Sequence, residues 1–174
     1  CQQESGNDGS LSATWYDKKG RVVRSESRIL GGAMVKTDRQ YNARGQLYRV
    51  SEPATGTPSS WNTVVYDHYG RVTSKTPFYG PSTGYGYSGA TTTRTVNGRD
   101  YLSTVDGAGL VTARSDPGGL ITYQYAANGL PESVQAPGGV ITTMEYDKNG
   151  HRLEIDDSAA GVITNRWYGT GEPK

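Results

Sequence analysis

The chain has 174 residues with 18 basic and 17 acidic groups, and its net charge of +1 gives no electrostatic case for binding nucleic acid. Hydrophobic residues make up only 33% of the chain, mean hydropathy is −0.68, and no apolar run approaches the roughly 20 residues needed to span a bilayer. A single cysteine excludes an intrachain disulfide framework and a cysteine-based zinc site. The 24 Gly and 13 Tyr favour a turn-dense, all-β chain with thin sheets.

Residues 1–13 are polar and nearly free of apolar side chains. Such a segment cannot bury enough surface to offset its ordering entropy, so we expect a flexible tail before a repeat region at 14–174. A cysteine followed by a polar tether resembles the start of a mature bacterial lipoprotein, which would make Cys1 a lipidation site and anchor the protein without a membrane span. The alternative is that Cys1 marks the boundary of a fragment.

From residue 16 onward the sequence repeats the phrase Tyr-Asp-x-x-Gly. The first three tyrosines are 25 residues apart, and the later copies begin 20 to 22 residues apart. A degenerate copy begins at Val105, and Tyr168-Gly169 begins a further one. Between Tyr66 and Val105 there is room for one degraded copy, of which Tyr85, Tyr87 and Asn97-Gly98-Arg99 are remnants. The residues of the five clear copies are Tyr16, Asp17 and Gly20; Tyr41 and Gly45; Tyr66, Asp67 and Gly70; Tyr125 and Gly129; and Tyr146, Asp147 and Gly150.

The residue types of the phrase predict a hairpin turn. The Asp can accept hydrogen bonds from backbone N–H groups two or three residues on, and the Gly supplies the positive φ that closes the hairpin. Pro-Gly-Gly at 117–119 and 137–139 would make the turns at the opposite edge, because Pro cannot sit inside a strand. The segments between turns are too short for buried helices. We therefore predict an all-β fold, in which tandem antiparallel hairpins form a twisted sheet or β-spiral.

At these residues the sequence resembles the YD-repeat or RHS-repeat family, which includes bacterial RHS toxins, cocoon subunits of insecticidal toxin complexes and teneurins. The close matches are the phrases at Tyr16 and Tyr66 and the looser one from Tyr146 to Leu153, and the resemblance covers about residues 14–174. It implies a strand spiral that can close into a hollow shell around a polypeptide. Full shells use many more repeats than the seven or so in this chain.

Asp116-Pro117-Gly118-Gly119 matches the letters of a motif found in the self-cleaving aspartyl protease region of that family. Paired-carboxylate catalysis needs a second acid held nearby, and the equivalent Ala136-Pro137-Gly138-Gly139 has lost the carboxylate while keeping the turn. We interpret both segments as turns and expect no enzyme activity.

The remaining polar residues predict neither a cofactor nor a metal site. His68 occupies a turn position that also takes Lys or Ala, and His151 lies beside a turn. The acids Glu52, Asp156 and Asp157 lack the alternating ligand pattern of a calcium loop, so we expect them to serve solubility.

The Gly-rich stretch 79–87 has two interpretations. Tyr79, Tyr85 and Tyr87, separated by glycines, would make an adaptable surface on which glycans stack. The alternative, which we favour, is a long hairpin loop or a bulged crossing between repeats.

Two functional hypotheses follow. The first is a non-enzymatic structural scaffold, secreted or on the bacterial cell surface, that associates with adjoining repeats or with copies of itself by strand addition. It rests on two expected open edges, one near Trp15-Tyr16 and one along Val162–Tyr168. The second is a carbohydrate-binding module that uses the exposed tyrosines.

Overall fold

The computed structural model describes residues 2–5 and 11–174, and the side chains from residue 11 onward. The described residues form strands and turns and contain no helix, so no helix among them is long and apolar enough to cross a membrane. The strands are β1 Gln2–Ser5, β2 Leu11–Tyr16, β3 Val22–Arg28, β4 Met34–Tyr41, β5 Leu47–Ser51, β6 Trp61–Tyr66, β7 Val72–Thr76, β8 Thr83–Ser88, β9 Thr91–Val96, β10 Arg99–Val105, β11 Val111–Asp116, β12 Gly119–Tyr125, β13 Pro131–Gln135, β14 Ile141–Tyr146, β15 Arg152–Asp157 and β16 Gly161–Thr164.

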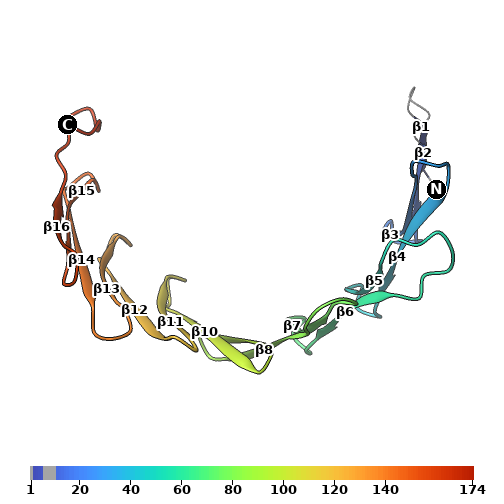
Figure 1. Ribbon diagram of the computed structural model, residues 1–174, viewed down its shortest axis with the longest axis horizontal. Helices are drawn as coiled ribbons and strands as arrows, with labels where there is room; N and C mark the ends of the chain where they lie inside the picture. The colour runs from blue at the N-terminus through green and yellow to red at the C-terminus, as the bar shows by residue number, and fades with distance from the viewer. Residues whose placement is uncertain (1, 6–10) are drawn as a thin grey trace. The chain divides into compact units, whose positions relative to one another are not determined.

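Strands that follow one another in the chain are neighbours in the sheet (Figure 1). The order runs from β1 to β16 without a crossover, and the pairings are antiparallel, so the all-β fold of tandem hairpins is confirmed. The chain divides within β8 into two compact units, Cys1–Tyr85 and Gly86–Lys174.

A register shift occurs at the first residue of the repeated phrase in both units. Tyr16 pairs with Val22, for example, and the ladder shifts between Trp15 and Tyr16. A bulge of this kind increases local twist and re-aims the side chain that follows it. The shifts lie at Trp15/Tyr16, Gln40/Tyr41, Val65/Tyr66, Thr104/Val105, Gln124/Tyr125 and Glu145/Tyr146.

The turns at the opposite ends of the strands are more varied. Asp116 pairs with Gly119 around a two-residue turn, whereas Gln135 pairs with Ile141 around a five-residue one, although both segments read Pro-Gly-Gly. Asn97 and Gly98 both have positive φ, +51° and +70°, as the two-residue turn between β9 and β10 requires.

The sheet is a single layer with almost no interior. Among the described residues only Ala13, Ser51 and Pro58 are buried. The accessible surface of the chain is 11747 Å², whereas a compact protein of this mass exposes about 8,300 Å². Half-buried side chains on a one-layer sheet therefore take the place of a hydrophobic core.

The two expected edges differ in extent from the structure. Gln2–Ser5 pairs with β2 from Gln2 opposite Thr14 to Ser5 opposite Leu11, so β2 is not the first strand of the sheet, although this pairing stops before Trp15-Tyr16. Strand formation at 2–5 and 11–13 also departs from the expected flexible tail at 1–13; Cys1 and residues 6–10 lie outside the described part of the chain. At the other end β16 stops at Thr164, because the chain turns back there and Trp167 bridges Pro173.

The expected long loop at 79–87 is also wrong in its second half. Thr83–Ser88 is strand β8, which pairs with β7 through Ser74 opposite Gly84 and Lys75 opposite Thr83. Alternating Tyr and Gly suits a strand that places its tyrosines on one face.

Candidate functional site

The most regular feature of the molecule is the row of turns built from the repeated phrase. Each turn has four positions that we name the anchor, the cap, the turn glycine and the return residue; at the first turn these are Tyr16, Asp17, Gly20 and Arg21. The cap N–H donates to the carbonyl of the return residue, and the N–H of the turn glycine donates to the cap carbonyl, at 2.8 and 3.0 Å. The same two bonds recur at caps Asn42, Asp67, Asp106, Ala126, Asp147 and Tyr168.

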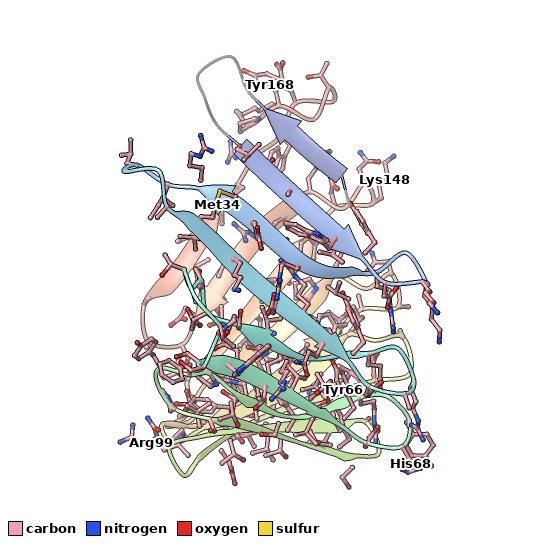
Figure 2. The ribbon with its side chains drawn as sticks, turned by 90° about the vertical axis from the view of Figure 1, so that its right-hand side faces the viewer. Met34, Tyr66, His68, Arg99, Lys148 and Tyr168 are labelled. Atoms are coloured by element: carbon pink, nitrogen blue, oxygen red, sulfur yellow. The ribbon has the colours of Figure 1, made fainter. Side chains whose placement is uncertain are left out.

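The caps that carry a carboxylate or amide side chain accept hydrogen bonds from the turn backbone. Oδ1 of Asp67 accepts the N–H groups of Tyr69 and Arg71, both at 2.9 Å, and Asn42, Asp106 and Asp147 repeat the arrangement. Figure 2 shows Tyr66 at the end of β6 and His68 in this turn. The turn glycines have φ between +77° and +87°, a conformation that favours glycine.

Ion pairs strengthen two of the caps. Nε of Arg21 donates to Oδ2 of Asp17 at 2.7 Å, and Arg71 does the same with Asp67. Hydrogen bonds from the backbone and guanidinium of Arg21 lower the pKa of Asp17. At Asp67 desolvation raises the pKa, but the hydrogen bonds from Arg71 outweigh it and the net shift is downward.

Successive turns are linked through the hydroxyl groups of the anchors. The Tyr41 hydroxyl donates to the carbonyl of Val22 at 2.9 Å, and Tyr66 donates to Leu47 at 2.7 Å. In the second unit Tyr125 donates to Val111 at 2.8 Å. In each case the acceptor follows the return residue of the preceding turn, so the tyrosine fastens its own hairpin to the one before it.

The return residue makes a second link, because its side chain extends over the next turn glycine. A Cβ on Gly45 would lie 3.1 Å from Nη1 of Arg21, and one on Gly70 would lie 3.0 Å from Nε2 of Gln46. Leu110, Leu130 and His151 take the same place over Gly129, Gly150 and Gly171. At Gly45, Gly70 and Gly171 the glycine is thus needed for close approach as well as for backbone conformation, whereas Leu110 and Leu130 lie at ordinary van der Waals distance from the Cβ positions of Gly129 and Gly150.

The last turn shows an anchor that the sequence analysis placed one residue too late. Trp167 occupies the anchor position, since its Nε1 donates to the carbonyl of Arg152 at 2.9 Å and Gly171 lies four residues on, with φ +87°. Tyr168, predicted to begin this copy, is the cap. The four-residue spacing to a glycine, which holds for Trp167 and fails for Tyr168, is the signal that identifies the anchor.

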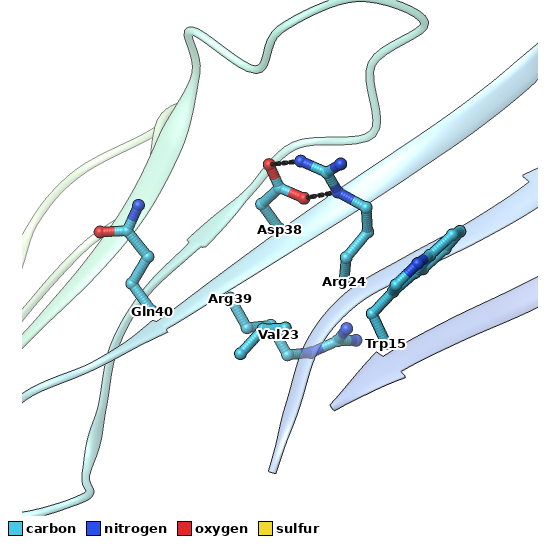
Figure 3. Close-up of a pocket in the computed structure, with 6 residues that line it drawn as sticks. All are labelled: Trp15, Val23, Arg24, Asp38, Arg39 and Gln40. Atoms are coloured by element: carbon cyan, nitrogen blue, oxygen red, sulfur yellow. Dashed lines mark hydrogen bonds and ion pairs between the residues drawn. The ribbon is translucent and has the colours of Figure 1, made fainter. Parts of the chain in front are cut away.

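A shallow cavity of about 280 Å³ lies in the first unit, beside the ion pair of Arg24 with Asp38 (Figure 3). Nε and Nη2 of Arg24 donate to the two carboxylate oxygens at 2.5 and 2.9 Å, and this hydrogen bonding lowers the pKa of Asp38. Trp15 from β2 and Gln40 from β4 complete its polar and aromatic lining. The sequence carried no signal for this pair, because it depends on the register of β3 with β4.

The three candidate glycan tyrosines do not form one exposed surface. Tyr79 is 77% exposed and lies edge-on to Phe78, with ring centroids 4.5 Å apart. Tyr85 and Tyr87 lie in β8 and are half-buried, and Lys75 lies over the Tyr85 ring.

The acids outside the row of turns have local partners. Oδ1 of Asp116 accepts the N–H of Gly118, Glu52 accepts Asn62, and Asp157 accepts Thr142 and the N–H groups of Ala159 and Ala160. No group of three metal-ligating side chains occurs among the residues that the structure describes.

Comparison with known proteins identifies the fold and leaves the family open. No protein-family model matches the chain, and no curated protein matches it. Crystal structures of TcdB2-TccC3 and TcdB2-TccC3-TEV share the fold, with TM-scores of 0.68 and 0.56 and identities of 13% and 12%. Both alignments cover 98% of this chain, which spans only 10% and 11% of theirs. A Tc holotoxin pore from Photorhabdus luminescens matches with a TM-score of 0.47 and 12% identity over 90% of this chain and 12% of its own.

Proposed function

We propose that the chain is a non-enzymatic structural scaffold whose hairpin repeats form part of a larger β-sheet shell or assembly. The observation that carries the proposal is that neighbouring turns within each unit are linked by the same positions. The ring of the anchor donates to a carbonyl of the preceding turn at Tyr41, Tyr66, Tyr125 and Trp167, and the return side chain lies over the next turn glycine at Gly45, Gly70, Gly129, Gly150 and Gly171. A repeat held only by its neighbours gains stability from every further repeat.

The single layer supports the same conclusion. Without a second layer, each hairpin depends on the hairpins at its sides, and the first and last strands benefit most from further pairing. Val162 and Ile163 in β16 are 57% and 61% exposed, at the end of the strand order. Adjoining repeats or further copies of this chain are the partners that such an edge accepts.

Light scattering over a concentration series, with electron microscopy of the same samples, tests association by strand addition. We expect the mass to rise with concentration and Ile163→Lys to abolish the rise, because a lysine on an edge strand opposes pairing. Leu120→Lys is the matched control, since Leu120 is 55% exposed but lies in an interior strand. A wild-type protein that stays monomeric at high micromolar concentration, without filaments, would contradict the proposal.

Export to the cell surface is part of the proposal and is supported by the family resemblance together with the shared fold of TcdB2-TccC3. Fractionation of the producing cells tests it. Recovery of the protein in the cytoplasm alone would remove this part and leave the scaffold role intact. Lipid attachment at Cys1 is tested separately by the intact mass of the purified mature protein, which would exceed the mass of the polypeptide by that of the acyl groups.

Carbohydrate binding is the second candidate function, and the exposure of Tyr79 next to Phe78 favours it. Exposed aromatic rings offer flat faces on which apolar sugar faces stack. A glycan array probed with the wild type and with Tyr79→Ala tests this function, and Tyr69→Ala, which removes a ring that is 73% exposed on another turn, is the control. Equal binding by wild type and Tyr79→Ala would exclude this surface.

A further inference from the structure

The return position of the turn at Asp147 is occupied by a titratable residue. Nδ1 of His151 lies 2.9 Å from Oδ2 of Asp147, in the place where Nε of Arg21 pairs with Asp17 and Nε of Arg71 pairs with Asp67. An arginine keeps its charge throughout the physiological range, whereas histidine side chains change charge between about pH 5 and 8. The same contact is therefore an ion pair at every physiological pH in the turns of Asp17 and Asp67. In the turn of Asp147 it is an ion pair only when His151 is protonated.

His151 also lies against the next hairpin, residues 167–174, which we name the Trp167 turn. The imidazole stacks on the Trp167 ring with centroids 5.1 Å apart and an interplanar angle of 22°. Its Nε2 lies 3.3 Å from where a Cβ on Gly171 would be. In the first unit Arg21 makes the equivalent contact with the anchor of the next turn, with its guanidinium 4.4 Å from the Tyr41 ring centroid.

Charged groups from several elements surround this imidazole. The group that pairs with the ring is the Asp147 carboxylate. Partial burial raises the pKa of Asp147, but hydrogen bonds from the His151 ring and from the N–H groups of His151 and Asn149 outweigh it, and the pKa is lowered. Asp147 is therefore ionised between about pH 5 and 8. The Lys174 ammonium lies over the Tyr168 ring, 5.0 Å from its centroid. The preceding turn, 126–130, carries no charged side chain. The other charged residues of β14, the turn after it, β15 and residues 165–174 are Glu145, Lys148, Arg152, Glu154, Asp156, Asp157, Arg166 and Glu172.

We propose that His151 is an acid-strengthened fastener, which on protonation ties the Trp167 turn more tightly to the turn at Asp147. Protonation turns a neutral hydrogen bond into an ion pair with Asp147 and places a cation on the face of Trp167. The direction follows from the charge: the ion pair with Asp147 needs the protonated ring, so we expect the fastening to be stronger near pH 5 than near pH 8. The inference concerns one turn of the described chain and holds whether or not the chain assembles.

Amide hydrogen exchange of the Trp167 turn, measured by NMR and corrected for the intrinsic effect of pH, tests the inference. The probes are the N–H groups of Tyr168 and Gly171, which bond the carbonyls of Glu172 and Tyr168. We expect their protection to rise about two- to fivefold between pH 7.5 and 5.5, the range measured for exposed ion pairs. Probes local to this turn are insensitive to His68, which lies in the other unit.

Two variants supply matched controls that the chain itself suggests. His151→Arg copies Arg21 and should be as protected at pH 7.5 as the wild type is at pH 5.5. His151→Leu copies Leu110 and Leu130, and should show low protection at both pH values. A wild type whose protection does not change with pH, or a His151→Leu variant that responds as the wild type does, would overturn the inference. If either variant fails to fold, the wild-type titration and the other variant still decide it.

Discussion

The turn glycines differ from one another at the level of single residues. Gly20 has φ +77° and open space around its Cβ position, whereas Gly70 has φ +86° and Nε2 of Gln46 at 3.0 Å. Gly107 lies in a turn of the same row without a positive φ and with nothing near it. These three positions separate the backbone requirement from the requirement for close approach.

Alanine substitutions at these three glycines should therefore have graded effects. Gly20→Ala should cost about 1 kcal/mol of stability, because a Cβ disfavours positive φ. Gly70→Ala should cost more, because it also displaces the Gln46 side chain. Gly107→Ala should be neutral or slightly stabilising. Urea unfolding of the three variants measures the order, and an unchanged stability for Gly70→Ala would argue against the role of the return residue.

Two acidic caps and the Arg24–Asp38 ion pair predict a loss of stability in acid. The pKa of each of Asp17, Asp38 and Asp67 is lowered in the folded protein, so each contributes stability above its ordinary pKa and loses it as pH falls through the lowered value. We expect thermal stability to fall below about pH 4. Asp67→Asn keeps the two backbone bonds that Asn42 makes at the same position, so it should reduce this acid dependence while retaining the turn. An Asp67→Asn variant with the same acid dependence as the wild type would exclude a contribution from this cap.

At the level of the hairpin, the anchor hydroxyl is the link that can be removed most cleanly. Tyr41→Phe deletes the hydroxyl that donates to Val22 and leaves the ring in place, so it should cost about 1 kcal/mol. Tyr69→Phe, at a 73% exposed side chain, is the control and should leave stability within about 0.5 kcal/mol. Denaturant unfolding followed by circular dichroism compares the two, and equal stabilities would mean that the hydroxyl is not a fastener.

The local elements were predictable from the sequence because their causes lie within five residues. An Asp that accepts two N–H groups and a Gly four positions after the anchor specify the turn by themselves, which is why Tyr16 to Gly20 and Tyr66 to Gly70 folded as expected. Pro-Gly-Gly is less informative, because 116–119 and 136–140 form turns of different length with these letters.

Features set by pairing across the sheet were not predictable in the same way. The Arg24–Asp38 ion pair depends on the register of two strands, and the pairing of Gln2–Ser5 with β2 depends on a contact that composition does not encode. The function of Trp167 was missed because tyrosine was taken as the mark of an anchor. An indole N–H reaches the same carbonyl position, so a ring donor other than the tyrosine hydroxyl makes the same link.

For the whole chain, the single layer predicts an unusual unfolding transition. The denaturant dependence of stability scales with the surface exposed on unfolding, and this chain already exposes 11747 Å² when folded. We therefore expect a smaller m-value in urea than for a compact domain of equal length.

The transition should also be broad, because units coupled only to their neighbours need not unfold together. Fluorescence of Trp15, Trp61 and Trp167 and far-ultraviolet circular dichroism should then give midpoints that do not coincide. Coincident midpoints with an ordinary m-value would indicate a cooperative core that the described residues do not show.

The neighbour-to-neighbour fastening has a consequence for how such a chain changes over generations. The contacts between hairpins recur at the same positions in both units, so a duplicated segment of 20 to 25 residues arrives with its own anchor and glycine and meets a neighbour that already fits. Deleting a segment of that length makes two formerly separated turns neighbours, and these two turns fit each other in the same way. Recombination between copies can therefore lengthen or shorten the gene in whole hairpins, and the size of the protein can drift while its local chemistry is preserved.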